Sequence, residues 1–162
     1  MILGHNVPTF GSHEIWSALW HCCGELYKSV YSFHSIRQAF IYMAFKHAKK
    51  NYSKTLDEIL QLTDSKNLNK YAIKAPNSAA WVSEREHILY DIIQERYLQH
   101  PEMKSILLQY DHSYPIYMNC NTCSYFCTGI KHTEFRWIYD SSNHFGRNEV
   151  GVCYMDIRQS EL

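Results

Sequence analysis

The end of the chain holds polar residues whose types and spacing suit the binding of a phosphorylated sugar. Arg147 and Asn148 follow Gly146, and a second glycine, Gly151, comes three residues after the asparagine. A glycine lets the backbone approach a ligand closely because it has no Cβ. An asparagine amide donates and accepts hydrogen bonds, and an arginine pairs with phosphate oxygens. This pattern predicts that Arg147 and Asn148 contact a phosphate or a sugar hydroxyl.

A second group of residues has the types and spacing of metal ligands. It consists of Cys120, Cys123, Cys127 and His132, with two, three and four residues between successive members. Zinc favours thiolate and imidazole ligands in a tetrahedral arrangement, and one short loop can supply all four. The same side chains could instead be free thiols buried among aromatic residues. The sequence leaves both interpretations open.

Length and composition limit the kinds of fold that can position these residues. The chain has 162 residues, 46% of them hydrophobic, which predicts one globular domain spanning 1–162. The formal net charge is +0, so the charge of the whole chain gives no reason to expect that it binds a nucleic acid or a membrane surface. A local basic cleft is still compatible with this net charge. Six cysteines without a secretory leader are typical of reduced thiols. We therefore expect an intracellular, cytoplasmic protein with no membrane partner.

Hydrophobic spacing predicts a mainly α-helical fold with a minor β part. Residues 1–33 and 110–145 lack helical periodicity and are expected to form loops and short strands. The expected helices are Ser35–Lys49, a second helix that Ser53 caps, Leu68–Ala75, a long helix from Ser78 or Ser83 to about Gln99, Pro101–Gln109 and Asn148–Arg158. The long helix should bury Ile88, Leu89, Ile92, Ile93 and Leu98 on one side.

Three blocks of the sequence occur in a fixed order along the chain. The first block is Phe33–Ala39, which holds Gln38-Ala39. The second runs from Trp81 to Leu108 and includes Gln99-His100-Pro101. The third is Gly146–Arg158. Together these blocks resemble the NADAR family (NAD- and ADP-ribose-associated, also called YbiA-like), whose Gly-Lys-Asn and Leu-Met-Glu-Ile-Arg ending is similar to the third block. The resemblance covers most of the chain, and residues 110–140 lie where the family is shorter, as a Cys-rich insertion would.

The resemblance implies a multihelical domain that cleaves N-glycosidic bonds. Family members act on phosphorylated ribosylamines or remove ADP-ribose from modified guanine, so a nucleotide or ribose-phosphate is the expected partner. Such cleavage passes through an oxocarbenium-like transition state, which a carboxylate can stabilise. By position, Lys70, Arg147 and Asn148 would contact phosphate and ribose, while Trp81 and Trp137 would contact the substrate through their rings.

The chain departs from the family pattern at its catalytic positions. The family's glutamate before Gln-Ala falls on His34, and the histidine that follows falls on Ser35. His34 could act as a general base near neutral pH, but an imidazole cannot replace an anion that stabilises a cation. Glu134, before Trp137, is the candidate carboxylate for that role. Three hypotheses stay open: an N-glycosidase or ADP-ribosyl hydrolase, a degenerate protein that binds ADP-ribose without turnover, and a zinc-stabilised interaction module.

Overall fold

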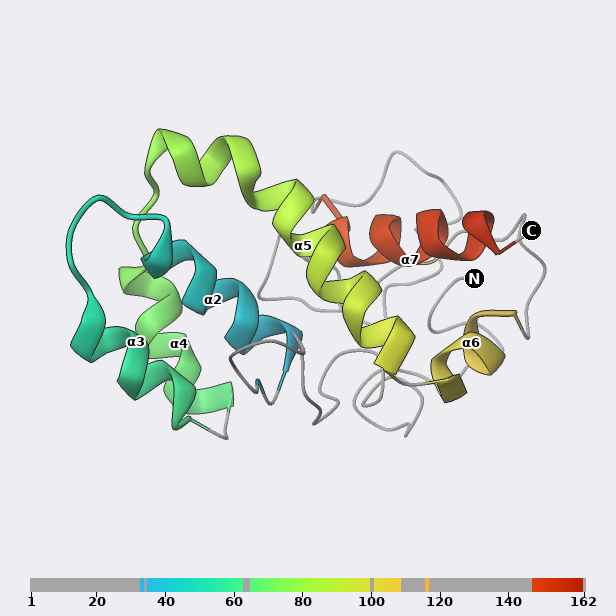
Figure 1. Ribbon diagram of the computed structural model, residues 1–162, viewed down its shortest axis with the longest axis horizontal. Coiled ribbons are helices and arrows are strands. Elements are labelled where there is room, and N and C mark those ends of the chain that lie inside the picture. The colour runs from blue at the N-terminus through green and yellow to red at the C-terminus, as the bar shows by residue number, and fades with distance from the viewer. Residues whose placement is uncertain are drawn as a thin grey trace, which may run out of the picture. The chain divides into compact units, whose positions relative to one another are not determined.

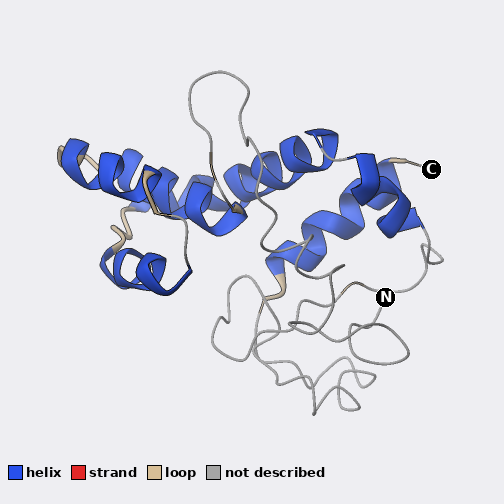
Figure 2. Ribbon diagram, turned by 90° about the horizontal axis from the view of Figure 1, so that it is seen from below, coloured by secondary structure: helices blue, strands red, loops and turns tan. Residues whose placement is uncertain are grey.

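The described part of this computed structural model is mainly α-helical, as the sequence predicts. The structure describes residues 33, 35–62, 65–99, 101–108, 116 and 147–161. Figure 2 shows that regular secondary structure in these residues is helical, and Phe33 forms an isolated β-bridge. The chain divides into two compact units, one of Trp20–Gln99 and one of Met1–Leu19 with His100–Leu162. Each unit is described by itself, and the expectation of one domain over 1–162 stays a prediction.

Helix α2 (Ile36–Lys46) is the central element of the unit of residues 20–99. Ser35 caps it, since its hydroxyl oxygen accepts a hydrogen bond from the Gln38 backbone N–H at 3.1 Å. The helix is buried on nearly all sides, so it needs neighbours around it. Those neighbours are α3 (Ser53–Leu60), α4 (Ser65–Lys74) and α5 (Ala79–Gln99), which Figure 1 shows around α2.

The helix boundaries differ from the expected ones in ways that local hydrogen bonds explain. Helix α2 ends at Lys46 rather than Lys49, and the Nδ1 atom of His47 lies 2.9 Å from the Met43 carbonyl oxygen. Ser53 is the first residue of α3 rather than its cap, because the Asn51 side chain accepts from the Ser53 backbone N–H at 2.9 Å. Ser78, the first of the two expected caps of α5, accepts from the Trp81 backbone N–H at 3.2 Å.

Helix α5 buries most of the stripe that its sequence predicts. Ile88, Leu89, Ile92 and Ile93 are buried, whereas the prediction for Leu98 is wrong, because its side chain is 66% exposed. Near its start, the ring of Trp81 packs edge-on against Phe40 of α2, with ring centroids 4.7 Å apart. This contact contributes to the packing of α5 against α2.

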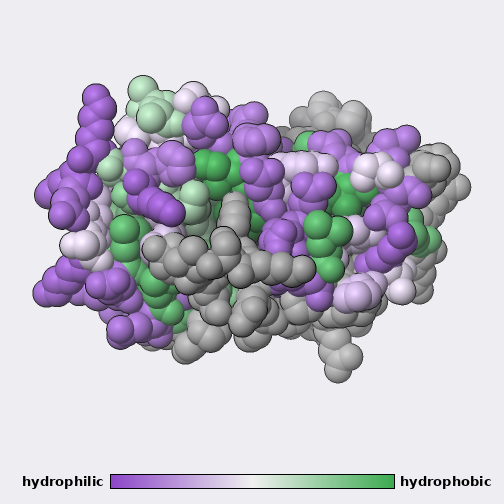
Figure 3. Space-filling model, in the orientation of Figure 1, coloured by the Kyte–Doolittle hydropathy of each residue, from purple (hydrophilic) through white to green (hydrophobic). Residues whose placement is uncertain are grey.

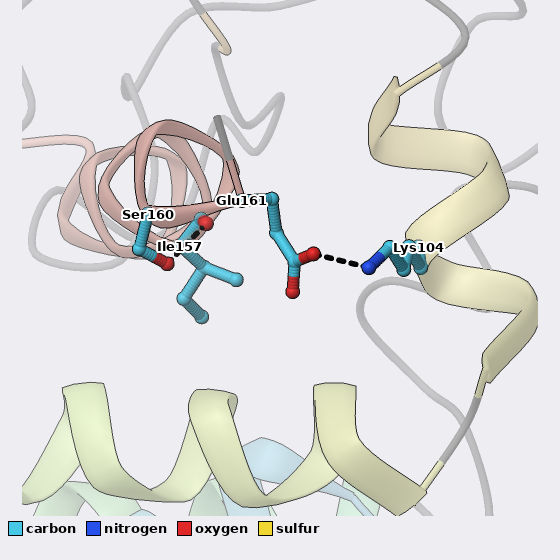
Figure 4. Close-up of polar contacts among 4 residues, drawn as sticks. All are labelled: Lys104, Ile157, Ser160 and Glu161. Carbon is cyan, nitrogen blue, oxygen red and sulfur yellow. Dashed lines mark hydrogen bonds and ion pairs between the residues drawn. The ribbon is translucent and has the colours of Figure 1, made fainter.

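The second unit contributes two described helices that touch each other. They are α6 (Pro101–Leu108) and α7 (Glu149–Ser160). Figure 4 shows the ion pair that joins them, between the Lys104 ammonium on α6 and the Glu161 carboxylate after α7. The Ser160 hydroxyl donates to the Ile157 carbonyl at 2.7 Å within the last turn. No helix in the described ranges combines the length and apolar composition needed to cross a membrane.

Candidate functional site

Lys70 lies on an exposed face of α4, and its neighbours in the chain hold that helix in place. Asn69 accepts a hydrogen bond from the Arg37 guanidinium on α2, at 2.5 Å. Tyr71 donates its hydroxyl to the Glu58 carboxylate on α3, at 2.8 Å. Lys70 itself is exposed and forms no ion pair with a described carboxylate. An ammonium that is positioned in this way, and that no described carboxylate neutralises, can bind a phosphate from solution.

The Tyr71 hydrogen bond also changes the acidity of the phenol. The bond to the Glu58 carboxylate raises the pKa of Tyr71, with further contributions from desolvation and from the negative charge of Glu58. The phenol therefore stays protonated at neutral pH and donates to Glu58. This interaction occupies one of the two described acidic residues on α3, the helix that precedes α4.

Trp81 lies in the packing between α2 and α5. Its side chain is 4% exposed, and besides Phe40 it contacts the ring of His47, with centroids 5.8 Å apart and planes inclined at 49°. Stacking of a base on Trp81 stays a prediction. It would require movement of the aromatic neighbours, because the folded arrangement leaves little of the indole face open.

Arg147 and Asn148 are adjacent residues before α7, but the first side chain is exposed and the second is buried. The Arg147 side chain is 48% exposed, and its Nη2 lies 2.7 Å from the Glu149 carboxylate. Asn148 is 3% exposed, and its Nδ2 donates to the Ile116 carbonyl at 2.8 Å. The guanidinium is thus accessible from solution, while the amide connects two segments of its own unit.

The backbone around Asn148 explains why an asparagine and a glycine stand here. Asn148 has a left-handed conformation, with φ 53° and ψ 35°, which asparagine tolerates better than most residues. One turn later, a Cβ on Gly151 would overlap the Ile116 oxygen and would lie 2.5 Å from the Asn148 Nδ2. The glycine that the sequence suggested for close approach to a ligand therefore gives room to the chain itself at Ile116.

Gln38 has a role that sequence reasoning missed. Its side chain is fully buried in α2, and its Nε2 donates to the carbonyls of Ile59 and Leu62, each at 2.8 Å. These carbonyls belong to the last turn of α3 and to the residues after it. The last carbonyls of a helix lack donors within the helix and need hydrogen bonds from elsewhere. The signal in the sequence was a lone amide among the apolar residues of Phe40–Phe45 and their neighbours, but its partners lie more than twenty residues away.

The remaining predicted site residues lie outside the described part of the chain. They are the catalytic candidates His34 and Glu134, the substrate contact Trp137, and the metal candidates Cys120, Cys123, Cys127 and His132. Among the residues that are described, no group of three or more histidine, cysteine, aspartate or glutamate side chains could hold a metal ion. The zinc hypothesis and the catalytic assignments stay predictions.

The comparisons with known proteins leave the family open. No family model matches this chain, and a search of curated proteins finds no match either.

Proposed function

We propose that this chain is a divergent NADAR-like protein that acts as an N-glycosidase or ADP-ribosyl hydrolase on a ribosylated base or an ADP-ribose-type nucleotide. The proposal rests on the three ordered sequence blocks and agrees with the mainly helical fold. Two of the blocks coincide with helix starts, since Ser35 caps α2 and Asn148 immediately precedes α7.

One observation supports the proposal most strongly. At the positions that carry the resemblance, the cations assigned to phosphate are exposed and two amides are buried. Lys70 and Arg147, which the resemblance assigns to phosphate, are exposed, whereas Gln38 and Asn148 are buried in internal hydrogen bonds. A phosphate needs accessible cations, and the amides stabilise the segments around them. We therefore assign phosphate binding to Lys70 and Arg147 and a supporting role to Asn148.

In the proposed reaction, water attacks the anomeric carbon as the bond to the base breaks. A carboxylate would stabilise the developing cation, and Glu134 is the candidate. His34 would take the proton from the attacking water, which an imidazole with a pKa near neutrality is suited to do. The base leaves with the bonding electrons and is protonated by solvent or by the imidazolium.

The experiment is to incubate the protein with ADP-ribosylated guanosine and separate the products by chromatography. We expect release of ADP-ribose and the unmodified nucleoside, with a loss of about 100-fold or more in the rate for Glu134→Gln. Glu84→Gln, which removes an exposed carboxylate from α5, is the matched control and should leave the rate unchanged. Intact substrate after long incubation would contradict hydrolase activity.

A second candidate is a protein that binds ADP-ribose without turnover. The observation that favours it is His34, a neutral or cationic side chain where the family has a glutamate. In this case ADP-ribose would raise the melting temperature while the ribosylated nucleoside stays intact. No thermal shift with ADP-ribose and no turnover together would rule out both candidates.

A further inference from the structure

Helix α4 carries a regular row of lysines. Lys66, Lys70 and Lys74 are four residues apart, which places their backbone positions on one face of the helix with a rise of about 6 Å from one to the next. The ten residues of α4 include no aspartate or glutamate. Like charges at this spacing destabilise a helix, so the row opposes the stability of the element that carries it.

Two members of this row, Lys70 and Lys74, have side chains that the structure describes. Lys70 and Lys74 are exposed, and neither is in an ion pair with a described carboxylate. Glu58 on α3, which reaches α4, accepts the hydroxyl of Tyr71 instead. Charges that are left exposed and uncompensated on one face attract an anionic partner.

The neighbouring elements extend the same charge. Between residues 35 and 75, the sequence has eight lysines and arginines against three carboxylates, Asp57, Glu58 and Asp64. Helix α5 has two arginines against four carboxylates. The basic residues are Arg37, Lys46, Lys49, Lys50, Lys54, Lys66, Lys70 and Lys74. On the face drawn in Figure 3, hydrophilic residues lie along the left edge, over α3 and the loop after α2. The net charge of +0 therefore conceals a basic region within one unit.

We infer that the lysine row of α4 binds an extended polyanion, namely the phosphodiester backbone of a single-stranded nucleic acid. A repeating cation along a straight helix suits a ligand with a repeating negative charge, and lysine contacts to phosphate carry no sequence preference. The inference touches the proposed function only through Lys70, which both would use. A strand bound along α4 would continue from a nucleotide whose phosphate Lys70 holds.

The structure favours a nucleic acid over a lipid surface. A helix that lies in a membrane interface inserts a broad apolar face. In α4 the apolar residue Leu68 is 3% exposed and packs inside the fold, which leaves Ile73 as the exposed large apolar side chain of this helix among the described side chains. One such residue does not form an inserting face.

The test is fluorescence anisotropy of a short labelled oligothymidylate with the full chain, over a range of salt concentrations. If three lysines displace counterions, the logarithm of the association constant should fall against the logarithm of salt with a slope of about −2. The double variant Lys66→Gln/Lys74→Gln should weaken binding about tenfold or more and reduce the magnitude of the slope by about 1.4. Lys104→Gln, which changes the same charge on α6, should bind as the wild type does.

Folding and ligand binding must be followed in the same variants. The double variant removes like-charge pairs, so its melting temperature should match or exceed that of the wild type. Its affinity for free ADP-ribose should be retained because Lys70 is intact, and this separates failure of the strand inference from failure of the proposed function. Wild-type binding with no salt dependence, or a double variant that binds the oligonucleotide like the wild type, would overturn the inference. Binding to anionic vesicles or to polyglutamate but not to the oligonucleotide would overturn it too.

Discussion

Gln38 in α2 and Asn148 before α7 are both buried amides that donate to backbone carbonyls of another segment, but they are constrained to different degrees. Gln38 stands in a regular helix, and its amide has only to reach the Ile59 and Leu62 carbonyls. Asn148 must reach the Ile116 carbonyl and also adopt a left-handed backbone. The first position therefore tests hydrogen bonding alone, and the second tests hydrogen bonding and backbone conformation together.

In both cases the fold gives a motif amide an internal hydrogen bond. Both amides lie in blocks that resemble a nucleotide-processing family, yet the described contacts of both are internal. Lys70 and Arg147, the cations that the resemblance assigns to phosphate, are exposed to solution. Stability measurements on the amides and binding measurements on the cations should therefore give separate results.

The largest effect is expected for Gln38→Leu. This change removes the buried amide that donates to the Ile59 and Leu62 carbonyls, while the Ile59 carbonyl keeps its hydrogen bond from the Leu62 backbone N–H. It should lower the free energy of unfolding by about 3 kcal/mol. Urea denaturation measures the loss. Gln94→Leu, on the exposed side of α5, is the matched control and should stay within about 0.5 kcal/mol of the wild type. Equal small losses for the two variants would show that the Gln38 hydrogen bonds contribute little.

Gly151→Ala should have the next largest effect. Alanine favours a helix over glycine by about 1 kcal/mol, but its Cβ would overlap the Ile116 oxygen and the Asn148 amide. We expect a net loss of about 2 kcal/mol in the free energy of unfolding, because backbone must move to make room. Val152→Ala, one residue later on the exposed side, should be neutral or slightly stabilising. A stabilised Gly151→Ala variant would contradict the close approach of Ile116.

The two demands on Asn148 can be separated by two substitutions. Asn148→Gly removes the amide and keeps the left-handed conformation accessible, at a cost of about 1 kcal/mol. Asn148→Ala removes the amide and also strains the backbone, which should add about 1 kcal/mol. Thermal or urea denaturation of both variants gives the difference. If alanine is tolerated as well as glycine, the left-handed backbone does not constrain this position.

The smallest effect is expected for Tyr71→Phe, and it should depend on pH. At neutral pH the variant loses one exposed hydrogen bond to Glu58, about 0.5 kcal/mol. Because the folded state raises the pKa of Tyr71, the unfolded chain loses the proton first as the pH rises past about 10. The stability of the wild type should then fall toward that of the variant in alkaline solution. If the difference in the free energy of unfolding between the two proteins stays constant across this pH range, the Tyr71–Glu58 hydrogen bond is not the cause of that difference.

Local patterns in the sequence were sufficient to predict the mainly helical fold and the approximate positions of its helices. Ser78 caps α5 as predicted, and Ser35, predicted as the first residue of a helix, is the cap of α2. Both predictions came close because helix starts depend on a few neighbouring residues. Leu98 was misplaced since helical spacing says which residues share a face but not where the covering elements stop. The partners of Gln38 and Asn148 could not be predicted, because they lie 21 to 32 residues away along the chain.

For the candidate site, the residue types predicted which chemical groups are present better than they predicted which side chains are accessible to solvent. Arg147 and Lys70 are exposed, as a phosphate contact requires. Asn148 has the donor that the sequence suggested, but the fold directs it to Ile116. Trp81 illustrates the same point, because an indole suits a base as well as it suits a core, and only the packing against Phe40 and His47 distinguishes the two.

The most direct test of the account is a calorimetric titration of ADP-ribose into the wild type, Arg147→Ala and Glu149→Gln. Loss of a charge-assisted contact should raise the dissociation constant of Arg147→Ala by about tenfold or more. Glu149→Gln removes the carboxylate that pairs with Arg147, a surface pair worth about 1 kcal/mol at most, and should bind as tightly as the wild type or more tightly. Equal affinity of Arg147→Ala and the wild type, or no binding of ADP-ribose by any of the three, would contradict the proposal that Arg147 contacts a phosphate of the nucleotide.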